Sequence, residues 1–519
     1  MFIEPGTNIK LLKNCPLDNT YEHTLYFANA SAQTTYFSGL AKYNLTNYTY
    51  QRVNKGVARV GIKADSLYDC NYMMFQNTNF GSKWFYAFIK SVEYVNNDTS
   101  EITFEIDVMQ TWFFNYKLDY CFVEREHTAT DEVGSNLVPE NLEVGEYVRN
   151  GNYNRLFSTA TDLAVLINVI NVTDSLGNGR NYDGIYGSGV IMAFKATDTH
   201  GINEYLKTMA QKTDNIQAIY TCPLFALNET IPDGGKELLN RDVSADYNSL
   251  VDALTGTETL NGYRPKNKKL YSYPYNYMEV TNGSGNKMKL RYEFMRNTNG
   301  RYGFECITSI TQPVQVICRP VGYKGSTLCP SESLALDDFP MCSWAVDGYQ
   351  AYIAQTAIPN GFSATLNALF ATISALVGGG GMATAIGGMN ALNTVTNTIS
   401  GAAQAKRGAD VSGGNFSSGS AITAHRQNQF YYTRCSINLD NAVVIDDYFT
   451  KFGYAVKQLV KPNRSSRPHW NYVKTVGCTI TGSVPCDDMR KICSIYDNGV
   501  TFWKNGSEVG NYHLDNSPT

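Results

Sequence analysis

Alternating apolar and polar positions run through the first 150 residues of the chain. In Ile102–Val108 every second residue is apolar, which predicts a half-buried β-strand whose polar face is formed by Thr103, Glu105 and Asp107. Trp84–Val95 has the composition of a second strand, and Asn96–Thr99 between the two supplies turn-forming residues. We therefore expect an antiparallel hairpin in this part of the chain.

Further strands are expected at Val57–Ile62, Leu118–Arg125 and Leu163–Val169. In the middle of the chain, Ile202–Ala210 carries apolar residues at helical spacing, and Ile216–Tyr220 follows with the pattern of a strand. This succession of helix and strand predicts an α+β arrangement for the middle region.

Two stretches near the C-terminus also predict local structure. Asp446–Val460 is expected to be helical and to end at Lys461-Pro462, because proline cannot continue a helix. Tyr496–Gly506 contains two Asn-Gly dipeptides beside β-forming residues, which is the pattern of a β-hairpin.

The most distinctive segment, residues 348–405, contains no Asp, Glu, Lys or Arg, although the overall 17% of charged residues predicts about ten. Its apolar residues recur at helical spacing in two series, separated by Gly378, Gly379, Gly380 and Gly381. The first series is Phe362, Leu366, Leu369, Phe370, Ile373, Leu376 and Val377, and the second is Met382, Ile386, Met389, Leu392, Val395 and Ile399. This pattern predicts a hairpin of two apolar helices, followed by a flexible return linker at Gly413–Ser420.

The uncharged segment has two interpretations. A helix over Ser363–Val377 would be about 22 Å long, too short for an ordinary span of a membrane core of about 30 Å, so the hairpin could be buried in a protein core or subunit contact. The glycines, including Gly387-Gly388, oppose this because each costs a rigid helix about 1 kcal/mol relative to alanine. The alternative is a membrane-active loop hinged at Gly378–Gly381, in which each absent charge avoids a cost of ~2.5–3.5 kcal/mol in lipid.

Composition and charge exclude several classes of protein. Charged residues make up 17% of the chain and aromatic residues 13%, with 36 tyrosines, which excludes a disordered protein. The net charge of −4 argues against a protein that grips nucleic acid through phosphate contacts. Low charge and many aromatic residues are typical of β-rich subunits with large permanent contacts.

The cysteines and histidines predict no zinc site, and we expect no cofactor. The twelve cysteines form no C-x-x-C pair, and the six histidines are scattered. The start of the chain, Met1–Pro5, lacks the basic and apolar regions of a signal peptide, so we expect synthesis in a cytoplasm. We therefore expect reduced, mostly buried cysteines.

Specific catalytic motifs are absent from the sequence. It contains no H-E-x-x-H, P-loop or G-x-S-x-G motif, so we expect no catalytic residues. The cluster Glu124–His127 has the residue types of acid–base machinery, but we interpret it as a strand end paired by local charges. A hydrolase built on two carboxylates far apart in the chain stays open at this point.

Four blocks of the sequence carry a family resemblance. They are Asn71–Phe88, Phe104–Trp112 followed by Phe122–His127, Ile445–Tyr454 followed by Val460–Thr475, and Asp497–Trp503. These blocks resemble the tail knob proteins of short-tailed phages of the phi-twenty-nine type (Salasmaviridae and relatives), which infect Gram-positive bacteria. The resemblance covers the first 150 and last 80 residues well, and the middle only by general pattern.

The resemblance implies a mainly β fold with α+β parts, in which β-barrel-like tail tube domains form a homohexameric tube at the distal end of the virion tail. Residues 1–150 would be the N-terminal tube domain, 151–347 a middle α+β domain, 348–425 the long hydrophobic loop, and 426–519 a segment returning to the tube. The implied partners are other tail proteins, such as the lower collar, and double-stranded DNA that passes without sequence-specific binding.

In this family the loops plug the tube and, on ejection, leave it to form a pore in the host cytoplasmic membrane, so membrane lipids are further implied partners. The uncharged segment sits where the family carries this loop. Two alternatives remain from the residues themselves. A tail-associated wall-degrading enzyme would show paired carboxylates with raised pKa values in a groove, and a receptor-binding tail protein would show a sugar cleft lined by aromatic residues.

Overall fold

The structure is a computed structural model of the 519-residue chain. It describes residues 6–48, 56–78, 81–157, 163–170, 180–182, 185–187, 189–211, 215–227, 229–238, 247–283, 285–295, 297–310, 314–325, 333–336, 341–346, 412–416 and 429–518. The described residues are mainly β, as the sequence predicts.

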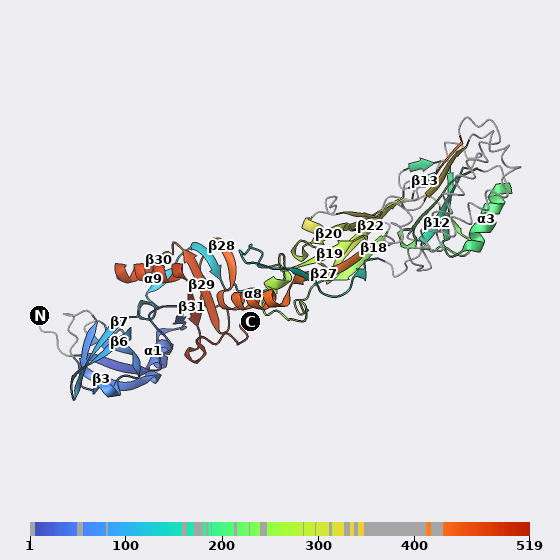
Figure 1. The fold of residues 1–519 in the computed structure, drawn as a ribbon. Coiled ribbons are helices and arrows are strands. Elements are labelled where there is room, and N and C mark those ends of the chain that lie inside the picture. The colour runs from blue at the N-terminus through green and yellow to red at the C-terminus, as the bar shows by residue number, and fades with distance from the viewer. Residues whose placement is uncertain are drawn as a thin grey trace. The chain divides into compact units, whose positions relative to one another are not determined.

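Two compact units divide the chain, and each combines segments that are far apart in the sequence. The first unit contains Met1–Glu146, Gly256–Tyr275 and Ile437–Thr519, and the second contains Tyr147–Thr255 and Asn276–Ser436. In Figure 1 the blue N-terminal and red C-terminal segments lie side by side within the first unit.

An antiparallel sheet of six strands begins the first unit, in the order β3-β1-β5-β6-β7-β4. Its strands are β3 (Ala41–Tyr48), β1 (Thr7–Lys13), β5 (Cys70–Asn77), β6 (Phe85–Asn96), β7 (Thr99–Ile106) and β4 (Val57–Val60).

Both faces of this sheet are buried at β5. Tyr72 and Met74 pack into a core that also contains Trp470 of the C-terminal segment, whereas Met73 and Phe75 enter a separate core on the other face. Because successive strand residues point to opposite faces, the nearly continuous apolar run of β5 is what a doubly covered strand requires.

A second sheet of the first unit interleaves N-terminal and C-terminal strands, in the order β2-β31-β29-β9-β28. These strands are β2 (His23–Leu25), β31 (Val500–Trp503), β29 (Trp470–Val476), β9 (Cys121–Glu126) and β28 (Tyr454–Val460). A small ribbon pairs β8 (Tyr116–Leu118) with β30 (Ile480–Gly482), and the helices are α1 (Ala30–Gly39), α2 (Val108–Thr111), α8 (Leu439–Phe452) and α9 (Cys486–Asn498).

The described residues of the second unit form three larger sheets and one ribbon. One sheet has the order β17-β15-β12-β16-β25-β26, with β17 (Lys236–Leu238), β15 (Gly189–Lys195), β12 (Leu163–Ile170), β16 (Asn215–Pro223), β25 (Met341–Val346) and β26 (Ser412–Phe416), and α3 spans Thr199–Gln211. The second contains β18 (Tyr247–Asp252), β22 (Arg301–Ser309), β23 (Gln315–Pro320), β24 (Leu334–Leu336) and β21 (Asn297–Thr298). The third contains β10 (Tyr147–Arg149), β27 (Tyr431–Ile437), β19 (Asn276–Thr281), β20 (Lys287–Leu290) and β11 (Asn154–Arg155), and β13 (Arg180–Tyr182) pairs with β14 (Ile185–Gly187).

The strands that precede and follow the uncharged segment in the sequence are neighbours at the edge of the six-stranded sheet of the second unit. Strands β25 and β26 pair antiparallel, and Val346 lies opposite Ser412. The expected linker at Gly413–Ser420 is therefore wrong for its first residues, because Gly413–Phe416 belong to β26. Backbone pairing with β25 holds them in a strand, since ladder hydrogen bonds need no side chain.

Several local predictions are confirmed. Strands β6 and β7 form the expected hairpin, with Asn96 opposite Thr99 at its turn. Strands β4, β12 and β16 and helix α3 lie where the patterns predict them. The expected strand at Leu118–Arg125 is interrupted, since β8 ends at Leu118 and β9 begins at Cys121.

The predicted helix at Asp446–Val460 is wrong in its second half. Helix α8 ends at Phe452, and Tyr454–Val460 form strand β28. Between them, Gly453 has φ +64°, and a Cβ atom there would lie 2.3 Å from the carbonyl oxygen of Glu126. A residue with a side chain therefore does not fit at this position, and the positive φ of Gly453 is one with which an α-helix cannot continue.

Two other predictions are also wrong in detail. Tyr496–Gly506 is not a hairpin, because Gly499 caps helix α9 in a positive-φ conformation and only β31 follows. Strand β7 ends at Ile106, so Val108 begins helix α2, and Asp107 is its buried N-cap rather than a solvated strand residue. In both places the residue that caps a helix is of a type that is also common in turns or strands.

Candidate functional site: a buried polar junction in the first unit

The loop residues predicted from Phe362 to Ile399, with the hinge at Gly378–Gly381, lie outside the residues that the structure describes. The charged groups with the strongest structural constraints lie instead in the first unit. They gather where β9, the segment Gly256–Tyr275 and the start of β28 meet.

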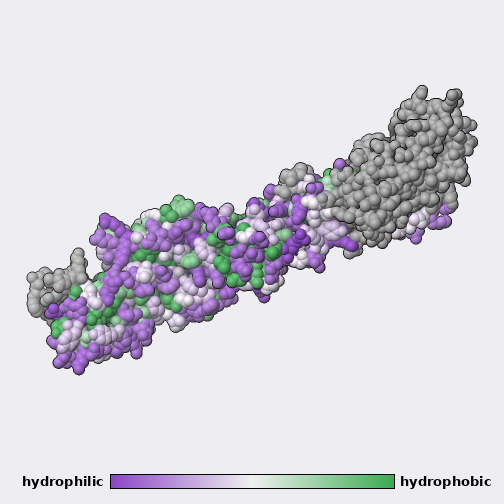
Figure 2. Space-filling view, in the orientation of Figure 1, coloured by the Kyte–Doolittle hydropathy of each residue, from purple (hydrophilic) through white to green (hydrophobic). Residues whose placement is uncertain are grey.

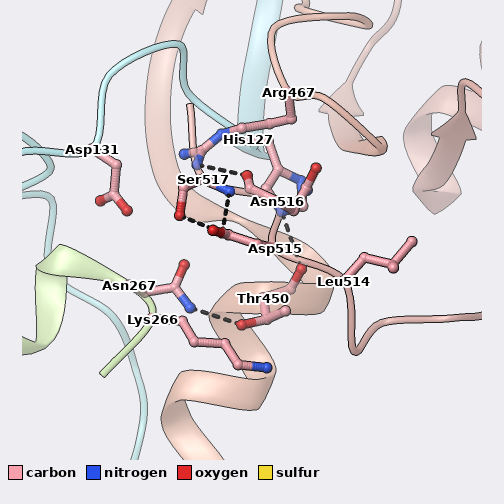
Figure 3. Close-up of a pocket in the computed structure, with 10 residues that line it drawn as sticks. All are labelled: His127, Asp131, Lys266, Asn267, Thr450, Arg467, Leu514, Asp515, Asn516 and Ser517. Carbon is pink, nitrogen blue, oxygen red and sulfur yellow. Dashed lines mark hydrogen bonds between the residues drawn. The ribbon is translucent and has the colours of Figure 1, made fainter. Parts of the chain in front are cut away.

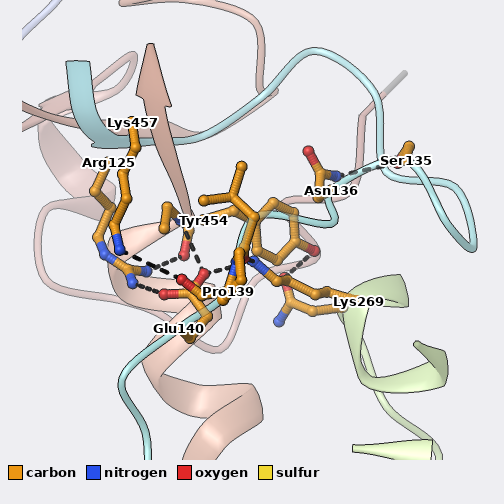
Figure 4. Close-up of polar contacts among 12 residues, drawn as sticks. Arg125, Ser135, Asn136, Pro139, Glu140, Lys269, Tyr454 and Lys457 are labelled. Atoms are coloured by element: carbon orange, nitrogen blue, oxygen red, sulfur yellow. Dashed lines mark hydrogen bonds and ion pairs between the residues drawn. The ribbon is translucent and has the colours of Figure 1, made fainter. Parts of the chain in front are cut away.

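Glu140 is the centre of this junction (Figure 4). Its side chain is 1% exposed and is paired with the guanidinium group of Arg125 and with Lys269 Nζ, which lies 2.6 Å from Oε1. The backbone N–H of Ala455 donates a further hydrogen bond of 2.9 Å to Oε1. One carboxylate therefore joins three segments of the chain.

The cations of the junction are also bound by backbone oxygens. Lys269 Nζ donates to the carbonyl oxygen of Val138 at 2.8 Å, and Arg125 Nη1 donates to that of Gly453 at 2.6 Å. Burial lowers the pKa of Lys269, while Glu140 acts in the opposite direction. Removing either partner would leave a charge buried without compensation, which costs far more than losing an exposed ion pair.

Asp446 fixes the same segment to helix α8. Its carboxylate is 1% exposed and accepts hydrogen bonds from the Tyr263 hydroxyl at 2.6 Å and from the backbone N–H groups of Lys266 and Asn267 at 2.8 and 3.0 Å. The side-chain amide of Asn267 donates to the same carboxylate at 2.8 Å. The segment Gly256–Tyr275 is thus held to α8 by four hydrogen bonds, all of which are accepted by the Asp446 carboxylate.

A small cavity lies beside this junction (Figure 3). It measures about 20 Å³, enough for roughly one water molecule. Among its lining residues, Asp131 accepts a hydrogen bond of 2.6 Å from the Tyr454 hydroxyl, and burial raises the pKa of Asp131. The cavity is too small for an organic substrate.

His127 also lines the cavity, but both of its ring nitrogens are occupied by the backbone. Nδ1 accepts from the N–H of Tyr472 at 2.8 Å, which leaves Nε2 to donate to the carbonyl oxygen of Thr450 at 3.2 Å. Burial, together with the positive charge of Arg467, lowers the pKa of His127 to about 3. The ring stays neutral and holds strands and helix together, so it is not placed to transfer a proton.

The other members of the Glu124–His127 cluster have separate partners. Glu124 pairs with Lys474 at 2.8 Å, Arg125 pairs with Glu140, and Glu126 accepts from the backbone N–H of Asn463 at 2.8 Å. The predicted charge pairing at a strand end is therefore correct for Glu124 and Arg125, but the partners come from distant segments rather than from local charges.

Two carboxyl groups of the first unit have strongly raised pKa values. Burial raises the pKa of Glu126 to about 7 and that of Asp107 to about 6. Asp107 accepts hydrogen bonds from the Tyr72 hydroxyl at 2.8 Å and from the backbone N–H of Gln110 at 3.0 Å. Each of these groups is held by its own structural donors, and neither lines the cavity of Figure 3.

The described part of the chain shows neither a metal-binding cluster nor a membrane-spanning helix. There, no group of three or more His, Cys, Asp or Glu residues is placed to hold a metal ion. None of the helices described is both long enough and apolar enough to cross a membrane.

Local sequence patterns do not reveal the roles of Glu140, Lys269, Asp446 and Asn267. The available signal was the basic run Arg264–Lys269, which carries four cationic residues and has the composition of a solvated loop. The burial of Lys269 depends on Glu140, which is 129 positions away, so the local pattern does not reveal it.

Comparison with known proteins gives this arrangement a context. A family model for the C-terminal domain of the Bacillus phage phi29 tail knob protein gp9 matches residues 240–517, more than half of the chain. The chain belongs to this tail knob family. A second model, for the N-terminus of the caudoviral major tail protein, matches residues 5–117, which include the six-stranded sheet of the first unit.

Relatives of this tail knob family cover nearly the whole chain. The chain is 27% identical to tail knob protein gp9 of Bacillus phage PZA and 26% identical to that of Bacillus phage phi29, each over 98% of both chains. The solved structure of the bacteriophage C1 tail knob protein gp12 has a TM-score of 0.62 and 16% identity, and it covers 97% of this chain and 98% of its own. The last comparison establishes similarity of fold.

The family resemblance of the four sequence blocks is thereby confirmed. The curated relatives are structural tail proteins, and the chain is a structural protein rather than an enzyme. For a tail knob family member, a buried junction of three segments serves to hold the first unit together.

Proposed function

We propose that this chain is a subunit of a phage tail knob and that six copies form a tube through which the genome leaves the virion. Its hydrophobic loops plug the tube before infection and then enter the host cytoplasmic membrane, where they form a pore that conducts DNA. The virion partners are other tail proteins at the distal end of the tail, such as the lower collar and tail tube.

The observation that carries this proposal is the match to tail knob proteins over 98% of the chain. A tube also accounts for the composition, because contacts between subunits bury aromatic side chains and exclude charges. The net charge of −4 per copy suits a lumen along which DNA slides, since acidic walls repel phosphates rather than binding them.

The two strands that flank the uncharged segment in the sequence support the role proposed for the loop. Val346 and Ser412, which precede and follow the segment in the sequence, are opposite each other in the β25–β26 pair. This strand pair can therefore stay in place in both the plugged and the released state that we propose. Because residues 348–405 carry no charged side chain, their transfer to lipid avoids the free-energy cost of burying charges.

Electron microscopy and solution mass of the purified protein test the tube. We expect hollow rings in negative stain and a particle of about six times 57.7 kDa. A stable monomer at micromolar concentration would contradict the ring.

Dye release from liposomes tests the loop. Asp substitutions at Leu369, Ile373 and Ile386 should leave rings intact but suppress leakage, because each buried carboxylate costs ~2.5–3.5 kcal/mol at a helix centre. The control is the apolar variant L369M/I373V/I386V, which should leak like the parent. If the Asp variant forms rings and still leaks, the segment has no membrane role.

Neither alternative function is favoured by the described residues. In that part of the chain, Glu126 and Asp107, whose pKa values are raised to about 7 and about 6, have separate backbone and hydroxyl donors, and Asp131, whose pKa is also raised, accepts from the Tyr454 hydroxyl. The described cavity at His127 has room for about one water, not for a sugar.

A further inference from the structure

An apolar row crosses one face of the second sheet of the first unit. Phe122 on β9 lies opposite Leu459 on β28 and opposite Val476 on β29, and all three side chains are exposed. Tyr120, two positions before Phe122, is exposed as well. Directly opposed residues on adjacent strands are neighbours at about 5 Å, so these side chains form one continuous patch, which we call the sheet patch.

A lysine borders the sheet patch at the end of strand β28, which is at the edge of its sheet. Lys461 is exposed and lies two residues after Leu459, whereas Lys457 lies at a register shift of β28 with its Nζ 3.5 Å from the carbonyl oxygen of Pro139. The acidic side chain near the patch, Glu124, is already paired with Lys474 at 2.8 Å. The sheet patch is therefore apolar with a positively charged border.

A second exposed apolar surface lies on helix α8. Asp440, Val443, Val444 and Asp447 have the spacing i, i+3, i+4, i+7, which places them on one face of the helix, and all four are exposed. We call these four residues the helix stripe. The stripe places two apolar side chains between two carboxylates, and Lys451, the next charge along this face, lies over the Tyr512 ring.

Figure 2 shows green apolar surface in two separate places. One lies over the region labelled α8 in Figure 1, and the other lies near the label β28. Leu459 is 69% exposed and Val444 is 67% exposed. Exposed apolar side chains that lie together are typical of interaction sites, which makes each surface a candidate contact.

We propose that the sheet patch of one copy of this chain binds the helix stripe of a second copy. The two surfaces match in chemistry, because Lys461 lies at the border of one and Asp440 and Asp447 lie at the ends of the other. Val443 and Val444 then lie against the apolar row.

This contact joins two different surfaces of the same chain. A head-to-tail interface of this kind builds a ring when its rotation closes, which is what a tube of identical subunits requires. The inference rests on the proposed assembly of copies and assigns the residues that mediate it.

Two single variants and their mixture test the interface. Leu459→Asp introduces a charge into the sheet patch, and Val444→Asp introduces a charge into the helix stripe. Each variant alone should therefore self-associate at least tenfold more weakly than the parent in analytical ultracentrifugation. Mixed together, the intact stripe of L459D and the intact patch of V444D should form a 1:1 dimer of twice 57.7 kDa. Tyr68→Asp is the matched control, because Tyr68 is 65% exposed but lies in neither surface, and it should assemble like the parent.

A charge exchange tests the border of the interface independently. Lys461→Glu and Asp447→Lys should each weaken association, and the double variant K461E/D447K should restore it. If the parent assembles and all variants assemble equally well, this surface assignment is wrong while the proposed tube stands. If the parent itself is monomeric, both the tube and the assignment are wrong.

Discussion

Glu140 and Lys269 form an ion pair of 2.6 Å in which the two side chains are only 1% and 4% exposed. They are 129 positions apart, and the pair joins the N-terminal segment to the inserted segment Gly256–Tyr275. Arg125 shares the same carboxylate from β9. The stability of the first unit therefore depends on a charge cluster that is well removed from solvent.

Replacing Glu140 by Ala should strongly destabilise the first unit. The substitution leaves Arg125 and Lys269 buried without their carboxylate, which typically costs about 3–5 kcal/mol in the free energy of unfolding. Urea unfolding at pH 7 measures the loss. The matched control is Asp487→Asn, since its ion pair with Arg490 is almost fully exposed, and a loss of equal size in both variants would contradict the special role of Glu140.

Gly453→Ala should add a steric clash to backbone strain, because φ +64° and ψ −148° at this residue is a conformation that essentially only glycine adopts. Its Cβ atom would lie 2.3 Å from the Glu126 carbonyl oxygen, so we expect a loss of about 3 kcal/mol or more. Gly477 has a similar φ of +67° with no atom within 4 Å, and Gly477→Ala should cost only the left-handed strain of about 1 kcal/mol. Equal thermal shifts for the two variants would show that the close approach to β9 is unimportant.

Glu126→Gln should change how stability depends on pH. Burial raises the pKa of Glu126 from 4.5 to about 7, so the folded protein keeps a proton that the unfolded chain loses between these values. The stability this proton contributes is complete below about pH 4.5 and is lost as the pH rises through about 7.

The variant should therefore match the parent near pH 4 and exceed its stability by up to about 3 kcal/mol at pH 8. Denaturant unfolding from pH 4 to 8 measures this difference, in which the opposite effect of His127 cancels because both proteins contain it. Glu124→Gln, on the same strand but 41% exposed, is the control. A difference that stays constant with pH would overturn the assignment.

The cysteines should titrate as free thiols. Free thiols in the described part of the chain include Cys15, Cys70, Cys121, Cys318 and Cys435, which are buried, and Cys486, which is exposed. Burial raises the pKa of Cys15 to about 12, which keeps this thiol unreactive. We expect close to twelve thiols in denaturant without reductant and preferential labelling of Cys486 in the native protein, whereas recovery of half or fewer would indicate disulfides.

Local patterns predicted much of the fold, as the hairpin of β6 and β7 illustrates. Ile102 and Phe104 are buried on one face of β7, and Asn96 and Thr99 close the turn, because burial on one face of a strand is recorded directly in alternation along the chain. Helix α3 was predictable for the same reason. The proposed loop was also predicted from a local property, the absence of charge over residues 348–405, and it stays a prediction.

Other features required the tertiary structure, because they depend on residues that meet only in the folded chain. The sequence by itself determined which segments favour strands, where charge is excluded and which family the blocks resemble. The tertiary structure decided that α8 ends at Gly453, since the backbone of Glu126 lies against that residue. It also decided that Lys269 is buried, since Glu140 compensates a charge that local sequence patterns would place in solvent.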